Sequence, residues 1–192
     1  MGYRRLWRRR GYRAEKLIAR CGQSGTARMR LATTRFNHGT WGENRAWRRS
    51  HNPVGCAYGV MKPISVEIPL NARVLVLEMN NEANEIMGIG LVLNVPDPRE
   101  NVPMYTDRNY CCYTYTGKHR IDRSAFSARE KIIVEILEYL VFRNATHLKR
   151  GQGITAMPPK LVAHVAVRGM DLVAEVGDMF RARFHMPPSA PG

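Results

Sequence analysis

The chain has no long hydrophobic run, and its cysteines show no metal-binding or disulfide pattern. Nothing in its 192 residues approaches 18 consecutive apolar positions, so the sequence predicts no membrane span. The first residues, MGYRRLWRRRGYR, lack the apolar segment of a secretory signal, although an arginine-rich, acid-poor start also fits a mitochondrial presequence. The four cysteines, Cys21, Cys56, Cys111 and Cys112, include no C-x-x-C pair. This favours reduced thiols and predicts neither a metal site nor a cofactor.

Acidic residues are scarce in the first 50 residues. This region contains 14 lysines and arginines against Glu15 and Glu43, a net charge of +12, whereas residues 51–192 carry only +2. The distribution predicts a basic arm joined to a nearly neutral body. Such an arm commonly binds a polyanion, either nucleic acid or an acidic protein surface. The alternative is a solvated, disordered tail.

The hydrophobic pattern predicts an α+β fold. A β-rich run from Val74 to Met79 and the segment IMGIGLVLNV read as a hairpin with an acidic tip, and NYCCYTYTG reads as a third strand. Gly88 and Gly90 lie on one face of the second strand, where they permit a bulge or the close approach of another backbone. Glu78 and Glu85, which flank the hairpin, are expected to be solvated.

Two helices are expected to pack on this sheet. Ser127 and Glu130 form a capping box ahead of KIIVEILEYLVF, which predicts a helix over 127–148. A second apolar periodicity predicts a C-terminal helix from about 160 to 184. The expected architecture is a small, mostly antiparallel, barrel-like sheet over about 55–120, packed by both helices. We expect a basic arm at 1–30, one α+β domain at 31–186 and a disordered tail at 187–192.

The stretch ATHLKRGQGITAM raises the question of a phosphate-binding loop. It is not a P-loop, because that motif precedes a helix and this one follows a predicted helix. One interpretation is a helix C-cap, with Gly151 just past the helix end and two cations near the last carbonyls. The other is a nest, in which the N–H groups of Gly151 and Gly153 bind a phosphate beside Lys149 and Arg150.

The stretch TRFNHGTWGENRAWRR mixes aromatic residues with arginines and is expected to be ordered but irregular. Aromatic side chains stack on unpaired bases while arginines bind phosphates, so it is typical of surfaces that bind single strands. The alternative is that its aromatic residues cover an edge of the core. Catalytic patterns are few: His119 and Asp122 could act as a His–Asp pair, but only if they converge in a cleft.

Several of these stretches resemble a family of uncharacterised proteins from large nucleocytoplasmic DNA viruses of protists. The resemblance covers about residues 33–155 and rests on TTRFNHGTW, GCAYG, the LEMNN…IMGIG hairpin, YTYTGKHRIDR and HLKRGQGI. It implies a viral origin and packaging in the virion, but no catalytic residue. The strand, polar tip and I-x-G-I-G-x-V strand are also similar to PUA-like barrels, including EVE-type domains. Those domains bind RNA or modified bases in an aromatic-lined pocket whose residues follow the hairpin. The aromatics offered here, Trp41, Trp47 and Tyr58, precede it.

The sequence therefore predicts a viral, non-enzymatic nucleic-acid-binding protein located in the virion, the host cytoplasm or the host nucleus. The alternative is a structural virion protein, a minor capsid or internal core component that contacts acidic virion proteins through the arm and the C-terminal helix. The oligomeric state and the choice between DNA and RNA stay open. The candidate nucleic-acid-binding residues are Arg4, Arg5, Arg8, Arg9, Arg10, Arg35, Trp41, Trp47, Arg48, Arg49, Lys149, Arg150, Gly151 and Gly153.

Overall fold

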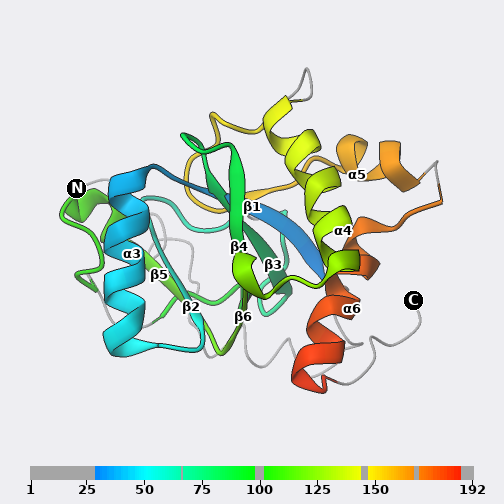
Figure 1. Cartoon of the computed structure of the whole chain (residues 1–192). Helices are drawn as coiled ribbons and strands as arrows, with labels where there is room; N and C mark the ends of the chain where they lie inside the picture. The colour runs from blue at the N-terminus through cyan, green and yellow to red at the C-terminus, as the bar shows by residue number, and fades with distance from the viewer. Residues whose placement is uncertain (1–28, 66, 98–101, 144–146, 167–168, 187–192) are drawn as a thin grey trace. The chain divides into compact units, whose positions relative to one another are not determined.

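A five-stranded sheet in the order β6–β4–β3–β1–β7 forms the centre of the fold (Figure 1). Its strands are β1 (Arg30–Phe36), β3 (Arg73–Asn80), β4 (Glu85–Leu93), β6 (His119–Asp122) and β7 (Thr155–Ala156). The β1–β3 pair is parallel and the other three pairs are antiparallel. The predicted α+β fold with a mostly antiparallel sheet is therefore confirmed, but the sheet is not closed into a barrel.

The computed structural model describes residues 29–65, 67–97, 102–143, 147–166 and 169–186. All of them belong to one unit that spans residues 28–188. The expected arm and tail lie almost wholly outside these ranges. Within them, no helix is both long enough and apolar enough to cross a membrane. The three cysteines in these ranges carry free thiols.

A second, two-stranded sheet pairs β2 (Cys56–Val60) with β5 (Tyr113–Gly117) in antiparallel register. It lies very close to β4 because glycines occupy the contact. A Cβ atom on Gly90 would lie 2.0 Å from the Tyr58 hydroxyl, and one on Gly117 would lie 1.9 Å from the Leu91 carbonyl oxygen. The groups that approach Gly90 are the side chains of Tyr58 and Cys56 rather than another backbone, whereas the β3–β4 register shifts between Leu77 and Met79, opposite Gly88, as the predicted bulge would require.

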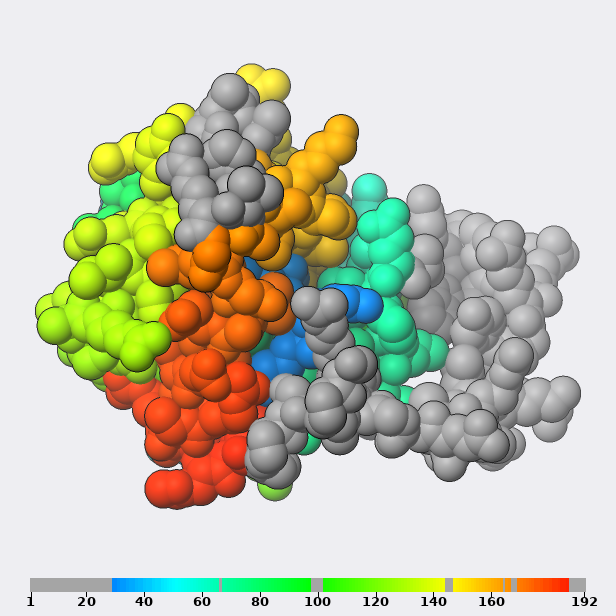
Figure 2. Space-filling model, turned by 90° about the vertical axis from the view of Figure 1, so that its right-hand side faces the viewer, coloured from blue at the N-terminus to red at the C-terminus, as the bar shows by residue number. Residues whose placement is uncertain are grey.

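The central sheet is covered on both faces, which explains why β3 is an almost continuous apolar run. Leu75, Leu77 and Met79 point toward a core formed with the C-terminal helices, whereas Val74 and Val76 point toward a core formed with the second sheet. Figure 2 shows the C-terminal helices side by side across one face. The helices are α3 (His38–His51), α4 (Ala128–Glu138), α5 (Pro159–Ala166) and α6 (Leu172–Phe184). The short helical turns are η1 (Arg108–Cys111), η2 (Arg123–Ala125) and η3 (Tyr139–Arg143).

The capping box that begins α4 is present as predicted. The Glu130 N–H donates to Ser127 Oγ, and the Ser127 N–H donates to Glu130 Oε2. The α-helix ends at Glu138 and continues only as the π-helical turn η3. The single helix expected over 160–184 is wrong. The chain takes a positive φ of 84° at Gly169, and the Asp171 side chain then caps the separate helix α6.

Helix α3 occupies the stretch that was expected to be irregular. The Asn37 side chain accepts from the Thr40 N–H at 2.7 Å, and the Thr40 hydroxyl accepts from the Asn37 N–H at 3.1 Å. This reciprocal cap satisfies two donors that the first turn leaves unpaired. The helix connects β1 to the second sheet and places its N-terminus beside the end of β1 (Figure 1).

Candidate functional site

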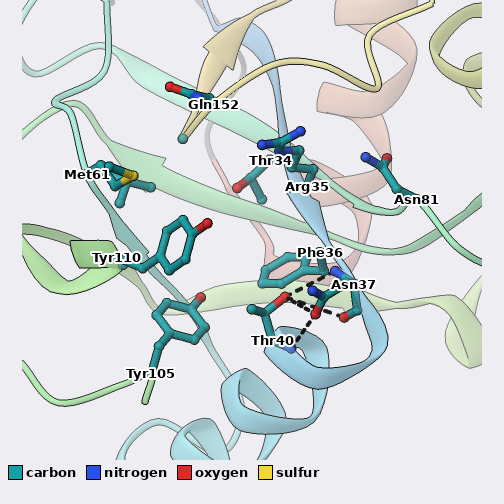
Figure 3. Close-up of a pocket in the computed structure, with 13 residues that line it drawn as sticks. Thr34, Arg35, Phe36, Asn37, Thr40, Met61, Asn81, Tyr105, Tyr110 and Gln152 are labelled. Atoms are coloured by element: carbon teal, nitrogen blue, oxygen red, sulfur yellow. Dashed lines mark hydrogen bonds between the residues drawn. The ribbon is translucent and has the colours of Figure 1, made fainter. Parts of the chain in front are cut away.

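A cavity of about 310 Å³, here called the aromatic slot, lies where β1 meets α3. Figure 3 shows the rings of Tyr105 and Tyr110 on one side of this space, with Phe36 and Thr34 on the other. Gly59, Val60 and Met61 come from the end of β2 and the residue after it, and Gln152 and Gly153 close the rim. The full lining is Thr34, Arg35, Phe36, Asn37, Thr40, Gly59, Val60, Met61, Asn81, Tyr105, Tyr110, Gln152 and Gly153.

The aromatic walls differ in how much of each side chain is exposed. Phe36 is buried and packs edge-on against Trp41, with ring centroids 5.2 Å apart. Tyr105 is also buried, and its ring meets that of Tyr110 edge-on at 6.2 Å. Tyr110 is 38% exposed, so one side of its ring is open to a ligand. The slot therefore has a fixed floor and one accessible aromatic side.

The Tyr105 hydroxyl is fixed in its protonated form. Burial raises its pKa well above the usual value, although hydrogen bonds from Asn44 and from the backbone of Gly59 act in the opposite direction. Asn44 Nδ2 donates to this oxygen at 3.1 Å. The phenol accepts from Asn44 and keeps its own proton, which is a donor beside the slot.

Asn81 supplies an unsatisfied polar group to the same cavity. Its Nδ2 donates to the Lys149 carbonyl at 2.9 Å, but its Oδ1 is buried and has no hydrogen-bond partner among the residues described. A buried acceptor without a partner is uncommon in native proteins. Next to a cavity, it favours a bound water or a ligand that carries an N–H group.

The KRGQG loop is neither a helix cap nor a complete nest. Helix α4 and its π turn end at Arg143, so residues 144–150 separate Gly151 from the helix end, and the cap interpretation is wrong. The Gly151 N–H donates to the Leu148 carbonyl at 3.2 Å, so it is already used within a turn. Gly153 has a φ of 70° and lies against Val60 at the slot rim.

The cations of this loop have different roles. Lys149 is half-buried, with its ammonium 5.8 Å from the centroid of the Phe142 ring, whereas Arg150 is exposed. The Lys149 carbonyl accepts from Arg35 Nη1 at 3.2 Å as well as from Asn81. Arg35 and Asn81 therefore hold the loop against the slot, and Arg35 brings a positive charge to its lining.

The two tryptophans predicted to stack on bases are core residues. Trp41 and Trp47 are only 7% and 9% exposed. The guanidinium groups of Arg48 and Arg120 lie over the Trp41 ring, and His51 stacks on Trp47 at 4.4 Å. Neither indole presents a free face in this structure, so the core-packing alternative describes both.

Apart from Arg150, the candidate arginines lie in three places. Arg35 lies at the slot, while Arg48 and Arg49 line a second cavity of about 320 Å³ at the other end of α3. That second cavity is here called the arginine pocket. The candidate arm residues Arg4, Arg5, Arg8, Arg9 and Arg10 lie outside the described ranges.

Glu78 is not solvated, contrary to expectation. It is fully buried, and its carboxylate accepts from Arg120 Nε and Nη2 and from the Tyr58 hydroxyl, at 2.7–3.0 Å. A Cβ atom on Gly88 would lie 2.4 Å from Arg120 Nη2, so the glycine provides the space for this pair. Tyr58 is fully buried beneath it and is therefore part of the core.

His119 and Asp122 do not form a catalytic pair. On β6, positions three apart point to opposite faces. His119 packs against Phe184 at 4.5 Å, whereas Asp122 binds Arg120 Nη1 at 2.7 Å and caps η2 through Ser124. Burial would raise the pKa of Asp122, but hydrogen bonds from Arg120 and Ser124 outweigh it and lower the pKa. Asp122 is therefore an ionised partner of Arg120.

The sequence interpretation missed Tyr105 and Tyr110. Both follow the hairpin, which is where the PUA-like resemblance expects pocket residues, in the stretch MYTDRNY. Their position after the hairpin was the signal that could have identified them as pocket residues. Compared with protein-family models, curated proteins and solved structures, the chain gives no match.

Proposed function

We propose that this protein binds single-stranded nucleic acid without catalysis, and that the aromatic slot holds one unpaired base. The observation that carries the proposal is the slot itself. A cavity of about 310 Å³ is at the small end of ligand sites, and its aromatic walls with a few fixed polar groups suit a planar heterocycle. Arg35 at the lining and the exposed Arg150 nearby are suited to the phosphates on either side of such a base.

The composition of the slot favours binding over chemistry. None of the described residues that line it is a histidine, cysteine, aspartate or glutamate, the side chains that most often transfer protons. Tyr105 has a raised pKa and is a poor base near neutrality. The hydrogen-bonding groups, Asn81 and Tyr105, are suited to reading the polar edge of a base.

The proposal includes the viral origin that the sequence resemblance implies, with the protein acting in the virion or the infected cell. The basic arm would add affinity that does not depend on sequence. In this proposal, the slot would distinguish unpaired strands from duplexes, because a paired base is not accessible for stacking.

The structural virion role remains the second candidate, and one observation favours it. Ile132 and Tyr139 are 57% and 59% exposed and lie seven residues apart on α4 and its continuation. Residues at that spacing share one helix face, which gives a packing partner an apolar contact there. For this role we propose a docking surface on α4 rather than on the C-terminal helix first expected.

The test of the proposal is oligonucleotide binding by the full chain, measured as fluorescence anisotropy. Tyr110→Ala removes the accessible ring, and loss of one base–aromatic stack costs about 1–3 kcal/mol, or roughly 5- to 150-fold in affinity. Tyr110→Phe keeps the ring and should bind like the wild type. Tyr139→Ala is the matched control, because this exposed tyrosine lies away from the slot lining.

Two outcomes would contradict the slot assignment. One is equal affinity of wild type and Tyr110→Ala for single strands. The other is an equal loss in Tyr110→Ala and Tyr139→Ala. The latter would point to general effects on the surface or to the α4 contact instead.

A further inference from the structure

The arginine pocket has a positive lining that the fold does not fully neutralise. It lies between the last turns of α3, the loop at Pro53–Gly55, and β6. Four arginines line it, together with the carboxylate of Asp122; they are Arg45, Arg48, Arg49 and Arg120. Even when the carboxylate of Glu78 beneath the pocket is counted, the cations outnumber the anions by two.

Arg48 gives the strongest argument that this pocket can bind an anion. Only 7% of the residue is exposed, yet it forms no salt bridge with any carboxylate in the described ranges. Its guanidinium makes one hydrogen bond within these ranges, from Nε to Asn44 Oδ1 at 2.9 Å. Both terminal nitrogens are left for a further partner. Buried cations are normally paired, so this arrangement favours an anion.

The electrostatic surroundings of Arg48 support the same conclusion. Burial lowers its pKa, and the positive charge of Arg120 lowers it further, while Glu78, Tyr58 and Asp122 act in the opposite direction. A basic residue in the last turn of a helix complements the helix dipole, which accounts for Arg49 at the surface. It does not account for Arg48, whose head group is turned back over Trp41.

The pocket is held rigidly before any ligand arrives. The guanidinium groups of Arg48 and Arg120 lie over the Trp41 ring at 5.5 and 5.6 Å. Arg120 is fixed by Glu78, Asp122 and the Met87 carbonyl. Asn52 donates to the carbonyls of Cys56 and Gly117, which fixes the loop at the pocket edge.

The chemistry of the lining suits a phosphate. Guanidinium groups bind carboxylate and phosphate alike through paired, charge-assisted hydrogen bonds. A doubly charged phosphate matches the excess of two cations in this pocket better than a single carboxylate does. Arg45 and Arg49 are exposed at i and i+4 on α3, with Arg48 between them, so all three project from one side of the helix end.

We propose that the arginine pocket is a specific phosphate-binding site. The phosphate comes either from free inorganic phosphate or from the backbone or end of a nucleic-acid strand. The site goes beyond the base slot, because it requires no base. The two sites are nevertheless connected: Asn44 donates to Tyr105 at the slot and accepts from Arg48 at the pocket.

The test uses the full chain and inorganic phosphate at constant ionic strength, with sodium chloride as the balancing salt. Isothermal titration calorimetry and thermal unfolding measure binding. In calorimetry, the heat released when phosphate is added to the wild type should reach saturation. In thermal unfolding, the melting temperature of the wild type should rise with phosphate but not with chloride. Arg45→Gln/Arg49→Gln changes only exposed side chains and should weaken phosphate binding about tenfold or more. Arg48→Met should do the same where it folds.

The matched control is Arg143→Gln, which removes an exposed arginine at the end of η3, far along the chain from the pocket. It should bind phosphate like the wild type. Oligonucleotides with a 5′-phosphate or a 5′-hydroxyl then identify the source of the phosphate. Loss of oligonucleotide binding in the pocket variants, with no response to inorganic phosphate, would assign the site to a strand.

The proposal fails if neither inorganic phosphate nor oligonucleotide binding changes between wild type and the Arg45→Gln/Arg49→Gln variant. It also fails if Arg143→Gln weakens binding equally. The base slot is tested separately, because Tyr110→Ala should weaken oligonucleotide binding but leave inorganic phosphate binding unchanged. The tests can therefore support one binding site while contradicting the other.

Discussion

At the scale of single residues, the buried pair of Glu78 and Arg120 is the least expected feature of the protein. Two charges removed from water are stable only when each has close partners, and here the carboxylate has Arg120 and Tyr58. Burial raises the pKa of the Tyr58 phenol well above its usual value, so the hydroxyl stays a donor. The thiol of Cys56 is close by, and burial together with Glu78 raises its pKa to about 12.

We expect Arg120→Met to destabilise the protein by about 3–5 kcal/mol, because it leaves the Glu78 carboxylate buried without its cation. Glu78→Met should also destabilise the protein, because it leaves the Arg120 guanidinium buried without its carboxylate partner. The double variant Glu78→Met/Arg120→Met should lose less than the two single losses added together. Urea unfolding followed by far-UV circular dichroism gives all three values.

Strict additivity in this cycle would mean that the two charges do not stabilise each other, and our account of Glu78 would be wrong. The alternation along β3 could have identified this residue, since Glu78 shares a parity with Val74 and Val76. The acidic hairpin tip that follows made it look like a surface residue. What the sequence does not give is the cation, because Arg120 lies 42 positions further along the chain.

At the scale of elements, the parts that could be predicted are those with local signals. The hairpin of β3 and β4 follows from alternation, and α4 follows from its capping box. Helix α3 was missed because its buried stripe contains Asn44 and Arg48 beside Trp41 and Trp47. The spacing is helical, but half of the stripe is polar, so hydrophobic periodicity underestimates it.

The slot and the pocket were predicted only in part, for a related reason. Tyr105 and Tyr110 come from an irregular stretch, and only tertiary packing brings them opposite Phe36. Arg35 and Gly153 were found because they lie in stretches with unusual composition. Arg45 lies in the same aromatic and arginine-rich stretch as Arg48 and Arg49, whereas Arg120 carries no local signal that separates it from ordinary surface arginines.

One glycine in α3 and one in β4 provide a contrasting pair of substitutions. Gly42 lies inside the helix, and a Cβ atom there would meet nothing within 4 Å, so Gly42→Ala should stabilise the protein by about 0.5–1 kcal/mol through helix propensity. Gly90→Ala on β4 should instead cost about 1–3 kcal/mol, because the new methyl group meets the Tyr58 hydroxyl. Thermal unfolding measures both. A destabilised Gly42→Ala variant would argue against a regular helix at this position.

At the scale of the whole molecule, the charge of the chain is divided unevenly. The net charge is +14, of which +12 belongs to the first 50 residues. Some of that share lies in α3, at Arg45, Arg48 and Arg49. Strand β1 starts at Arg30, and α3 with its three arginines belongs to the folded body.

We expect the arm to set the salt dependence of nucleic-acid binding. Each contact with a single-strand phosphate contributes about 0.7 to the slope of log affinity against log salt, so replacing five arginines by glutamine should reduce the slope by up to about 3.5. The variant carries Gln at positions Arg4, Arg5, Arg8, Arg9 and Arg10. Binding across a series of sodium chloride concentrations measures the slope.

Tyr110→Ala is the control for this series, because loss of a stacking ring should lower the affinity and leave the slope unchanged. An unaltered slope in the arginine variant would show that the arm contacts no phosphate. The solvated tail or an acidic protein partner would then be the better explanation of its charge.

The two guanidinium groups over Trp41 have a practical consequence. Indole emission shifts with the electric field of nearby charges, and an anion that arrives between Arg48 and Arg120 changes that field. The chain has three tryptophans, so replacing Trp7 and Trp47 by phenylalanine leaves one fluorophore at this place. The intrinsic fluorescence of Trp41 would then report whether the arginine pocket is occupied, without a label on protein or ligand.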